Sequence, residues 1–132
     1  MKLVEEINLP NGLTLQIFDL SRSIAANTVK VETSFQVKIA LAESFFISAE
    51  DYILVKNIFG NELTYEHKME RTFVLQKDSD ATREELIATF KNNSLNYLGK
   101  ENFAEKLALS LLRDIRNNPY KYSMSPTADL PD

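Results

Sequence analysis

The sequence predicts an α+β fold: a four-stranded antiparallel meander, a short helix before the last strand and two C-terminal helices packed on one sheet face. Residues 28–42 and 62–76 alternate apolar and polar side chains, which is the two-residue period of a strand with one buried face. After residue 77 the apolar residues recur every three or four positions, which is the period of an amphipathic helix. Strands therefore precede helices, and this order is typical of α+β proteins.

The first 22 residues predict a β-hairpin. Its turn is the sequence Pro-Asn-Gly at 10–12, because proline presets one backbone dihedral and Asn-Gly adopts positive φ at low cost. Alternation resumes after the turn, with Leu15 and Ile17 on one side of the second strand. Residues 21–27 are mostly small and polar, so we expect a loop before the third strand.

The two long strands each carry one apolar set, which favours an antiparallel sheet with one side on a core. The set of the third strand comprises Val29, Val31, Thr33, Phe35, Val37, Ile39 and Leu41. The set of the fourth strand comprises Leu63, Tyr65, Met69, Phe73 and Leu75. We therefore expect these side chains to face the core.

The helices have recognisable start and stop residues. Ser48 is suited to cap the amide of Asp51 and so begin the short helix, which Gly60 ends. The second helix ends at Gly99, and the third is expected over about residues 102–116.

At 132 residues the chain fits one domain, and it contains no internal repeat or linker. We place this domain at residues 1–119, because the helical periodicity ends just before Pro119. Residues 120–132 contain prolines and small polar side chains, which predicts a flexible C-terminal tail.

The composition argues against several chemistries. The chain has no cysteine, which removes disulfides, thiolate metal sites and cysteine nucleophiles. Its single histidine cannot supply a multi-histidine zinc site, and its three glycines form no phosphate-binding loop. We therefore expect no metal, no cofactor and no catalytic residue, and the interpretation leans away from an enzyme.

The net charge of −4 makes nucleic acid a poor partner, because an acidic chain repels phosphate backbones. A small basic end at Arg113, Arg116 and Lys121 fits the negative end of a helix dipole, with a docking tail as the alternative. No apolar run is long enough to span a bilayer, and the charged N-terminus is unlike a secretory signal. We expect a cytoplasmic protein without a membrane partner.

Three ionisable residues break the apolar pattern. His67 and Arg71 fall in the apolar set of the fourth strand, and Asp19 follows that of the second. A charged residue on a core face must be paired or must reach an edge, so Asp19 and Arg71 are candidates for a partly buried pair with His67 nearby. The functional interpretation is a ligand-binding polar pocket between sheet and helices. The structural interpretation is a strand end in water, or a bulge that shifts the alternation.

The opposite face of the fourth strand carries Glu66, Lys68 and Glu70. This alternating charge is interpreted as a solvated sheet surface, stabilised by opposite charges on the neighbouring strand. The alternative interpretation is a recognition surface.

Three segments resemble a small family of uncharacterised bacterial single-domain proteins. They are residues 9–24 (LPNGLTLQIFDLSRSI), 65–73 (YEHKMERTF) and 102–107 (NFAEKL). That family has no assigned activity, so the resemblance implies a bacterial intracellular protein and no particular function.

The sequence therefore favours a non-enzymatic intracellular interaction or regulatory module. Its partner is expected to be a protein, including a second copy of itself, because a meander has open edge strands. The alternative is a small-molecule-binding protein or enzyme with its pocket at Asp19, His67 and Arg71.

Overall fold

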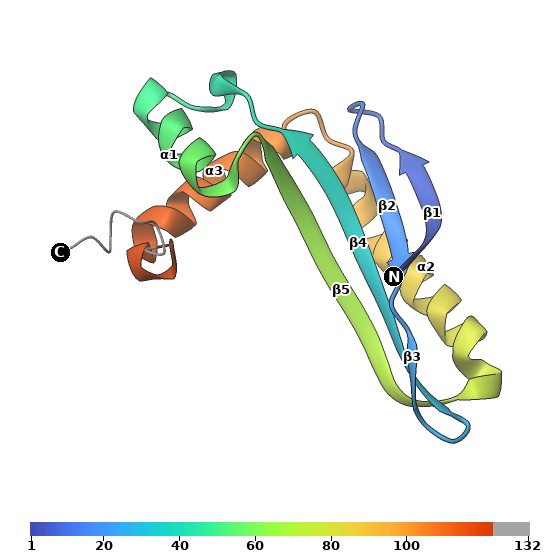
Figure 1. Ribbon diagram of the computed structural model, residues 1–132. Helices are drawn as coiled ribbons and strands as arrows, with labels where there is room; N and C mark the ends of the chain where they lie inside the picture. Colours follow the sequence, from blue (N-terminus) through green and yellow to red (C-terminus); the bar gives the residue numbers. More distant parts are fainter. Residues whose placement is uncertain (123–132) are drawn as a thin grey trace. The chain divides into compact units, whose positions relative to one another are not determined.

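The computed structural model describes residues 1–122 and confirms the α+β class (Figure 1). The strands are β1 (Lys2–Asn8), β2 (Thr14–Asp19), β3 (Arg22–Ala25), β4 (Thr28–Ala40) and β5 (Glu62–Leu75). The helices are α1 (Ala49–Phe59), α2 (Ser79–Leu98) and α3 (Phe103–Asn117). The short helix before the last long strand and the two helices after it are thus confirmed. Of the predicted tail, the part from residue 123 onward lies outside the described residues.

The chain forms two compact units, and each is built from two separate segments. The first unit comprises residues 1–38 and 64–101, and the second comprises residues 39–63 and the segment from 102 onward. The single domain that we placed at residues 1–119 stays a prediction.

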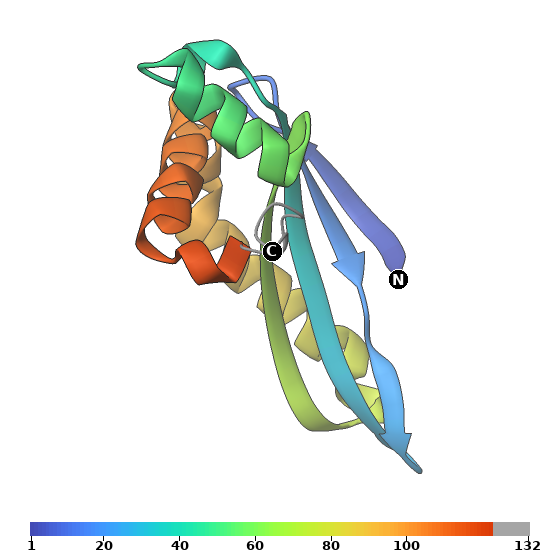
Figure 2. The ribbon, with the colours of Figure 1, turned by 60° about the vertical axis from the view of Figure 1, so that its left-hand side comes forward.

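The sheet of the first unit is an antiparallel meander. β1 pairs with β2 and β2 pairs with β4, with Ile7 opposite Leu15 and Leu15 opposite Val37. β5 pairs with β4 and lies along its other edge (Figures 1 and 2). The predicted hairpin turn is present, with Gly12 at a φ of 89° and the Asn11 side chain accepting from the amide of Leu13 at 3.1 Å.

The segment expected to be a loop at 21–27 contains a short strand, β3. Arg22 and Ser23 of β3 lie opposite Lys30 and Val29 of β4. The amide of Leu20 donates to the carbonyl of Glu32 at 2.8 Å, so β3 continues the pairing that β2 begins. Because β4 is much longer than β2, the first half of β4 pairs with β3 instead, and within β3 only Ile24 has a strong strand propensity.

The alternation of β5 shifts at Phe73, contrary to the prediction that Phe73 and Leu75 face the core. Phe73 has a left-handed backbone with φ of 57° and is 80% exposed, and Leu75 is 50% exposed. The amide of Leu41 donates to the carbonyl of Asn61, and the amide of Gln76 donates to the carbonyl of Asn27. Between these two hydrogen bonds, the segment that contains β5 is one residue longer than the segment that contains β4. An extra residue of this kind is a β-bulge, and it reverses which side chains face the core.

The core of the first unit lies between the sheet and α2, which covers one face of it (Figure 2). Phe35 of β4 is fully buried and stacks on Phe90 of α2, with ring centroids 3.9 Å apart. Beside them Val29, Val31 and Leu86 form a buried cluster against which Met69 and Val74 of β5 pack. Val74 therefore takes the core position that the alternation had assigned to its neighbours.

The second unit contains α1 and α3, which contact each other. Ser48 caps α1 by accepting from the amide of Asp51 at 3.2 Å, and Gly60 ends it with φ of 82°, both as predicted. Asp51 forms an ion pair with Arg116 of α3. After α3, a 3-10 turn over Pro119–Tyr122 brings the Tyr122 ring edge-on to Phe59, with centroids 5.8 Å apart.

Within the described residues, no helix combines the length and the apolar character that a membrane crossing requires.

Candidate functional site

Asp19 forms its ion pair with Arg83 of α2, and not with Arg71 as predicted. A guanidinium nitrogen of Arg83 lies 3.2 Å from the carboxylate, and the amide of Ser21 donates to the same carboxylate at 2.9 Å. Burial raises the pKa of Asp19, but the Ser21 hydrogen bonds and the Arg83 charge outweigh it, so the pKa lies below its usual value. Asp19 is therefore held as a carboxylate under α2.

His67 and Arg71 lie on exposed parts of β5. The His67 ring lies against Phe90, with centroids 5.8 Å apart. The Arg71 guanidinium donates to the backbone carbonyl of Glu70, its own neighbour, at 3.2 Å. Asp19, His67 and Arg71 thus interact with three different partners and not with one another, and a ligand-binding role for them stays a prediction.

Sequence reasoning missed Arg83 as the partner of Asp19. Arg83 stands in the first part of α2 beside Asp80 and Glu84, and it contacts both carboxylates, at 3.4 and 3.9 Å. Only the packing of α2 on β2 shows that the guanidinium also reaches inward to Asp19.

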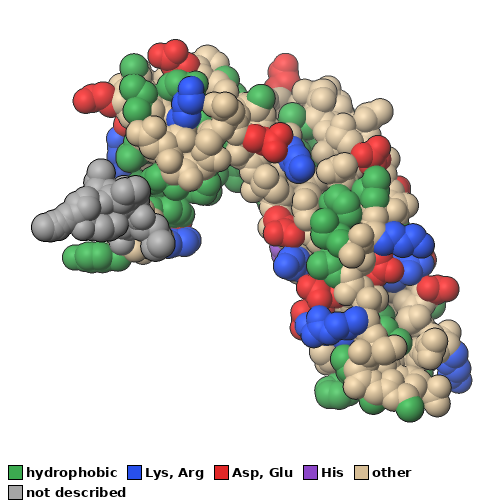
Figure 3. Space-filling view, in the orientation of Figure 1, with side chains coloured by type: hydrophobic (Ala, Val, Ile, Leu, Met, Phe, Trp, Pro, Cys, Tyr) green, Lys and Arg blue, Asp and Glu red, His purple; other side chains and the backbone are tan. Residues whose placement is uncertain are grey.

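On the sheet face away from α2, acidic and basic side chains alternate next to a hydrophobic area (Figure 3). Glu66 of β5 accepts from the hydroxyl of Ser34 at 2.6 Å and from the amide of Gln36 at 3.2 Å, both on β4. Glu70 lies 3.3 Å from the ammonium of Lys30. Glu66 and Glu70 therefore have partners on β4, and the Glu70–Lys30 contact is the pairing of opposite charges expected of a stabilised sheet surface.

Lys68 differs from its two acidic neighbours. It is exposed, and it has no hydrogen-bond or ion-pair partner within residues 1–122. Glu66 and Glu70, two positions to either side, each have partners on β4. An unpaired cation thus stands between two paired carboxylates at the middle of the strand.

The outer side of β5 is a row of backbone groups without a strand partner. In the described part of the chain, β5 pairs with β4 alone. The carbonyl of Asn61 accepts from the amide of Leu41, the residue after β4, and antiparallel pairing makes every second residue bond to the same neighbouring strand. The even-numbered residues up to Thr72 therefore direct their N–H and C=O groups away from β4. We call this segment, residues 64–72, the β5 edge.

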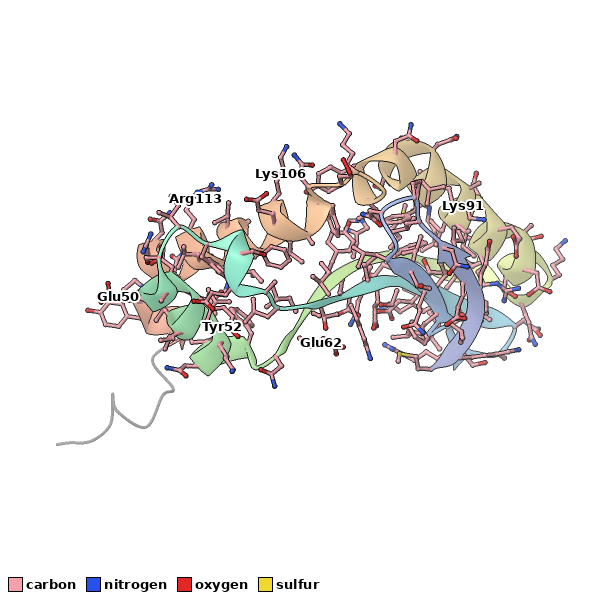
Figure 4. All side chains as sticks on the ribbon, turned by 90° about the horizontal axis from the view of Figure 1, so that it is seen from above. Glu50, Tyr52, Glu62, Lys91, Lys106 and Arg113 are labelled. Carbon is pink, nitrogen blue, oxygen red and sulfur yellow. The ribbon has the colours of Figure 1, made fainter. Side chains whose placement is uncertain are left out.

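The second unit has a surface groove of about 290 Å³ lined by α3, by Ile47 before α1 and by Asp51 of α1. Leu109 and Leu112 form its apolar part, and Ile47 beside them is fully exposed. Arg113 projects from the same side of α3 as Lys106 (Figure 4). This groove combines an apolar floor with a basic rim.

The predicted basic end is largely neutralised within the second unit. Arg116 pairs with Asp51, and Lys121 pairs with Asp114 at 2.9 Å. Hydrogen bonds from Tyr122 and Lys121 lower the pKa of Asp114. These cations are therefore held by carboxylates of their own unit, which weakens their suitability for phosphate binding.

The described residues contain no group of three histidine or carboxylate side chains arranged to hold a metal ion. No family model, no curated protein and no solved structure matches the chain. The resemblance to a bacterial family therefore stays a prediction.

Proposed function

We propose that this chain is a non-enzymatic interaction module that binds a protein by accepting a strand at the β5 edge. The observation that carries the proposal is a long strand that pairs on one side only, within the described residues. An extended peptide added to such an edge gains main-chain hydrogen bonds along its whole length.

The β5 edge lacks the strongest devices that proteins use to block strand addition. It contains no proline, and the one bulge, at Phe73, lies beyond it. Its charges are of both signs, whereas a run of like charges repels an added strand by electrostatics alone. Charge on an edge strand also protects it from strands of arbitrary sequence, so these charges favour a strand that carries the complementary charges.

The test compares two substitutions of Lys68. Lys68→Pro removes an outward N–H group and leaves the bonds to β4 in place, whereas Lys68→Ala removes the same charge and keeps the N–H. Each variant and the unaltered chain serve as bait in lysate of the cells that produce the protein. We expect proteins captured by the unaltered chain and by Lys68→Ala to be lost with Lys68→Pro. Equal capture by all three baits would refute strand addition.

The location of the protein in the cell is also proposed. A cytoplasmic location in a bacterium agrees with a chain that has no cysteine, since cysteine-free chains need no oxidising compartment. Fractionation of the producing cells tests this location, and recovery of the protein outside the cytoplasm would contradict it.

A small-molecule-binding role at Asp19, His67 and Arg71 is the second candidate. The observation in its favour is the Nε of Arg83, a buried atom in the ion-paired guanidinium beside Asp19 that has no hydrogen-bond partner among residues 1–122. A ligand at a hundred times its dissociation constant raises the free energy of unfolding by about 2.7 kcal/mol. A thermal-shift screen with metabolites therefore tests the candidate, with Arg83→Met as the variant that should lose any response.

A further inference from the structure

We propose that the partner at the β5 edge is the β5 edge of a second copy, paired antiparallel about a two-fold axis at Met69. This inference rests on the proposed function, because it names the strand that is added. Two identical edges pair symmetrically only if the sequence is complementary to itself when reversed.

Antiparallel pairing places directly opposed side chains on the same face of the sheet. With the axis at Lys68, each Lys68 would face its own copy, and Glu66 would face the partner's Glu70. Every charged contact would then join like charges, so this register is unfavourable.

With the axis at Met69, each Lys68 faces the partner's Glu70, and the symmetry makes this contact twice. Glu66 then faces the partner's Thr72, which carries no charge. Lys68 has no charged partner within residues 1–122, and the Glu70 side chain is 51% exposed despite its contact with Lys30. The register therefore supplies the unpaired cation with an accessible carboxylate.

An axis at His67 also pairs opposite charges, because each Lys68 would then face the partner's Glu66. However, the Glu66 carboxylate already accepts hydrogen bonds from Ser34 and Gln36, so a further partner has less access to it. The two imidazoles would also face each other at the axis. The Met69 register avoids both problems, and it places two partly buried methionine side chains side by side.

The backbone agrees with this arrangement. The carbonyl of Glu70 faces away from β4, and within residues 1–122 it accepts from the exposed guanidinium of Arg71. In the Met69 register, Lys68 and the partner's Glu70 form a hydrogen-bonded pair of residues. The Glu70 carbonyl then accepts from the Lys68 amide of the other copy and no longer from the exposed Arg71 guanidinium.

Charge reversal on the full chain tests the register. We expect the unaltered protein to dimerise in sedimentation, and Lys68→Glu or Glu70→Lys alone to weaken the dimer about tenfold. The double variant Lys68→Glu/Glu70→Lys should restore it. Lys38→Glu, an exposed reversal on β4, is the matched control and should have no effect.

Cysteine crosslinking gives an independent readout, because the chain has no cysteine of its own. Opposed residues at a two-fold axis lie close enough for a disulfide. Met69→Cys should therefore form a covalent dimer in air, and His67→Cys should not.

Three outcomes would overturn the inference. A monomer at all concentrations refutes self-pairing, while loss of capture by Lys68→Pro alone would still support the proposed function. Rescue of Lys68→Glu by Glu66→Lys, or crosslinking at His67→Cys only, refutes the Met69 register. If the dissociation constant of the dimer is the same for every β5 variant, the interface lies elsewhere.

Discussion

The two long strands β4 and β5 have nearly the same length and the same alternating pattern, yet their side chains have different surroundings. β4 has strand neighbours along both edges, and its Phe35 is fully buried. β5 has one neighbour among the described strands, and its Phe73 is 80% exposed. The contrast shows that alternation of apolar and polar residues identifies a strand, whereas the position of the strand in the sheet determines what the strand can bind.

The largest expected effect comes from the same truncation in the two strands. Phe35→Ala removes a buried ring that stacks on Phe90, and it should lower the free energy of unfolding by about 3–5 kcal/mol. Phe73→Ala removes an exposed ring, and its effect should stay within about 0.5 kcal/mol. Urea unfolding measures both, and similar losses would contradict the difference in burial.

A smaller effect is expected for two charged residues, Asp19 of β2, which contacts α2, and Arg71 of the β5 edge. Asp19→Asn removes a charge that Arg83 and Ser21 bind, and it should cost about 1–2 kcal/mol at neutral pH. Arg71→Gln at the β5 edge should cost less than about 0.5 kcal/mol, because its recorded hydrogen bond is exposed.

The Asp19 effect should also depend on pH. Because folding lowers the pKa of Asp19, its contribution to stability is complete above the unfolded value of about 4 and is lost as the pH falls through the lower folded value. The difference in unfolding free energy between Asp19→Asn and the unaltered chain should therefore shrink below about pH 4. A difference that stays constant down to pH 2 would contradict the lowered pKa.

The smallest effect is expected for a glycine substitution at the bulge of β5. Phe73 holds a left-handed backbone, which costs a residue with a side chain about 1 kcal/mol relative to glycine. Phe73→Gly should therefore stabilise the protein by up to that amount, although glycine weakens most strand positions. Thermal unfolding of Phe73→Gly beside Phe73→Ala measures this, and a lower melting temperature for the glycine variant would contradict it.

The order of the elements other than β3 follows from the sequence, because the two-residue and the four-residue periods are local properties. The hairpin turn at 10–12, the cap at Ser48 and the stop at Gly60 were predictable for the same reason: each rests on a dihedral or a hydrogen bond between near neighbours. The charges of Glu66, Lys68 and Glu70 were also recognised as one polar face.

Which strand is an edge and which charges pair depends on the tertiary structure. Arg83 reaches Asp19 from a distant helix, and Phe73 faces away from the core because one extra residue lies in β5. Both depend on long-range pairing, in which the register of one strand is set by another far along the chain. The free backbone of the β5 edge is a property of this kind, since strand order cannot be deduced from the alternation within a single strand.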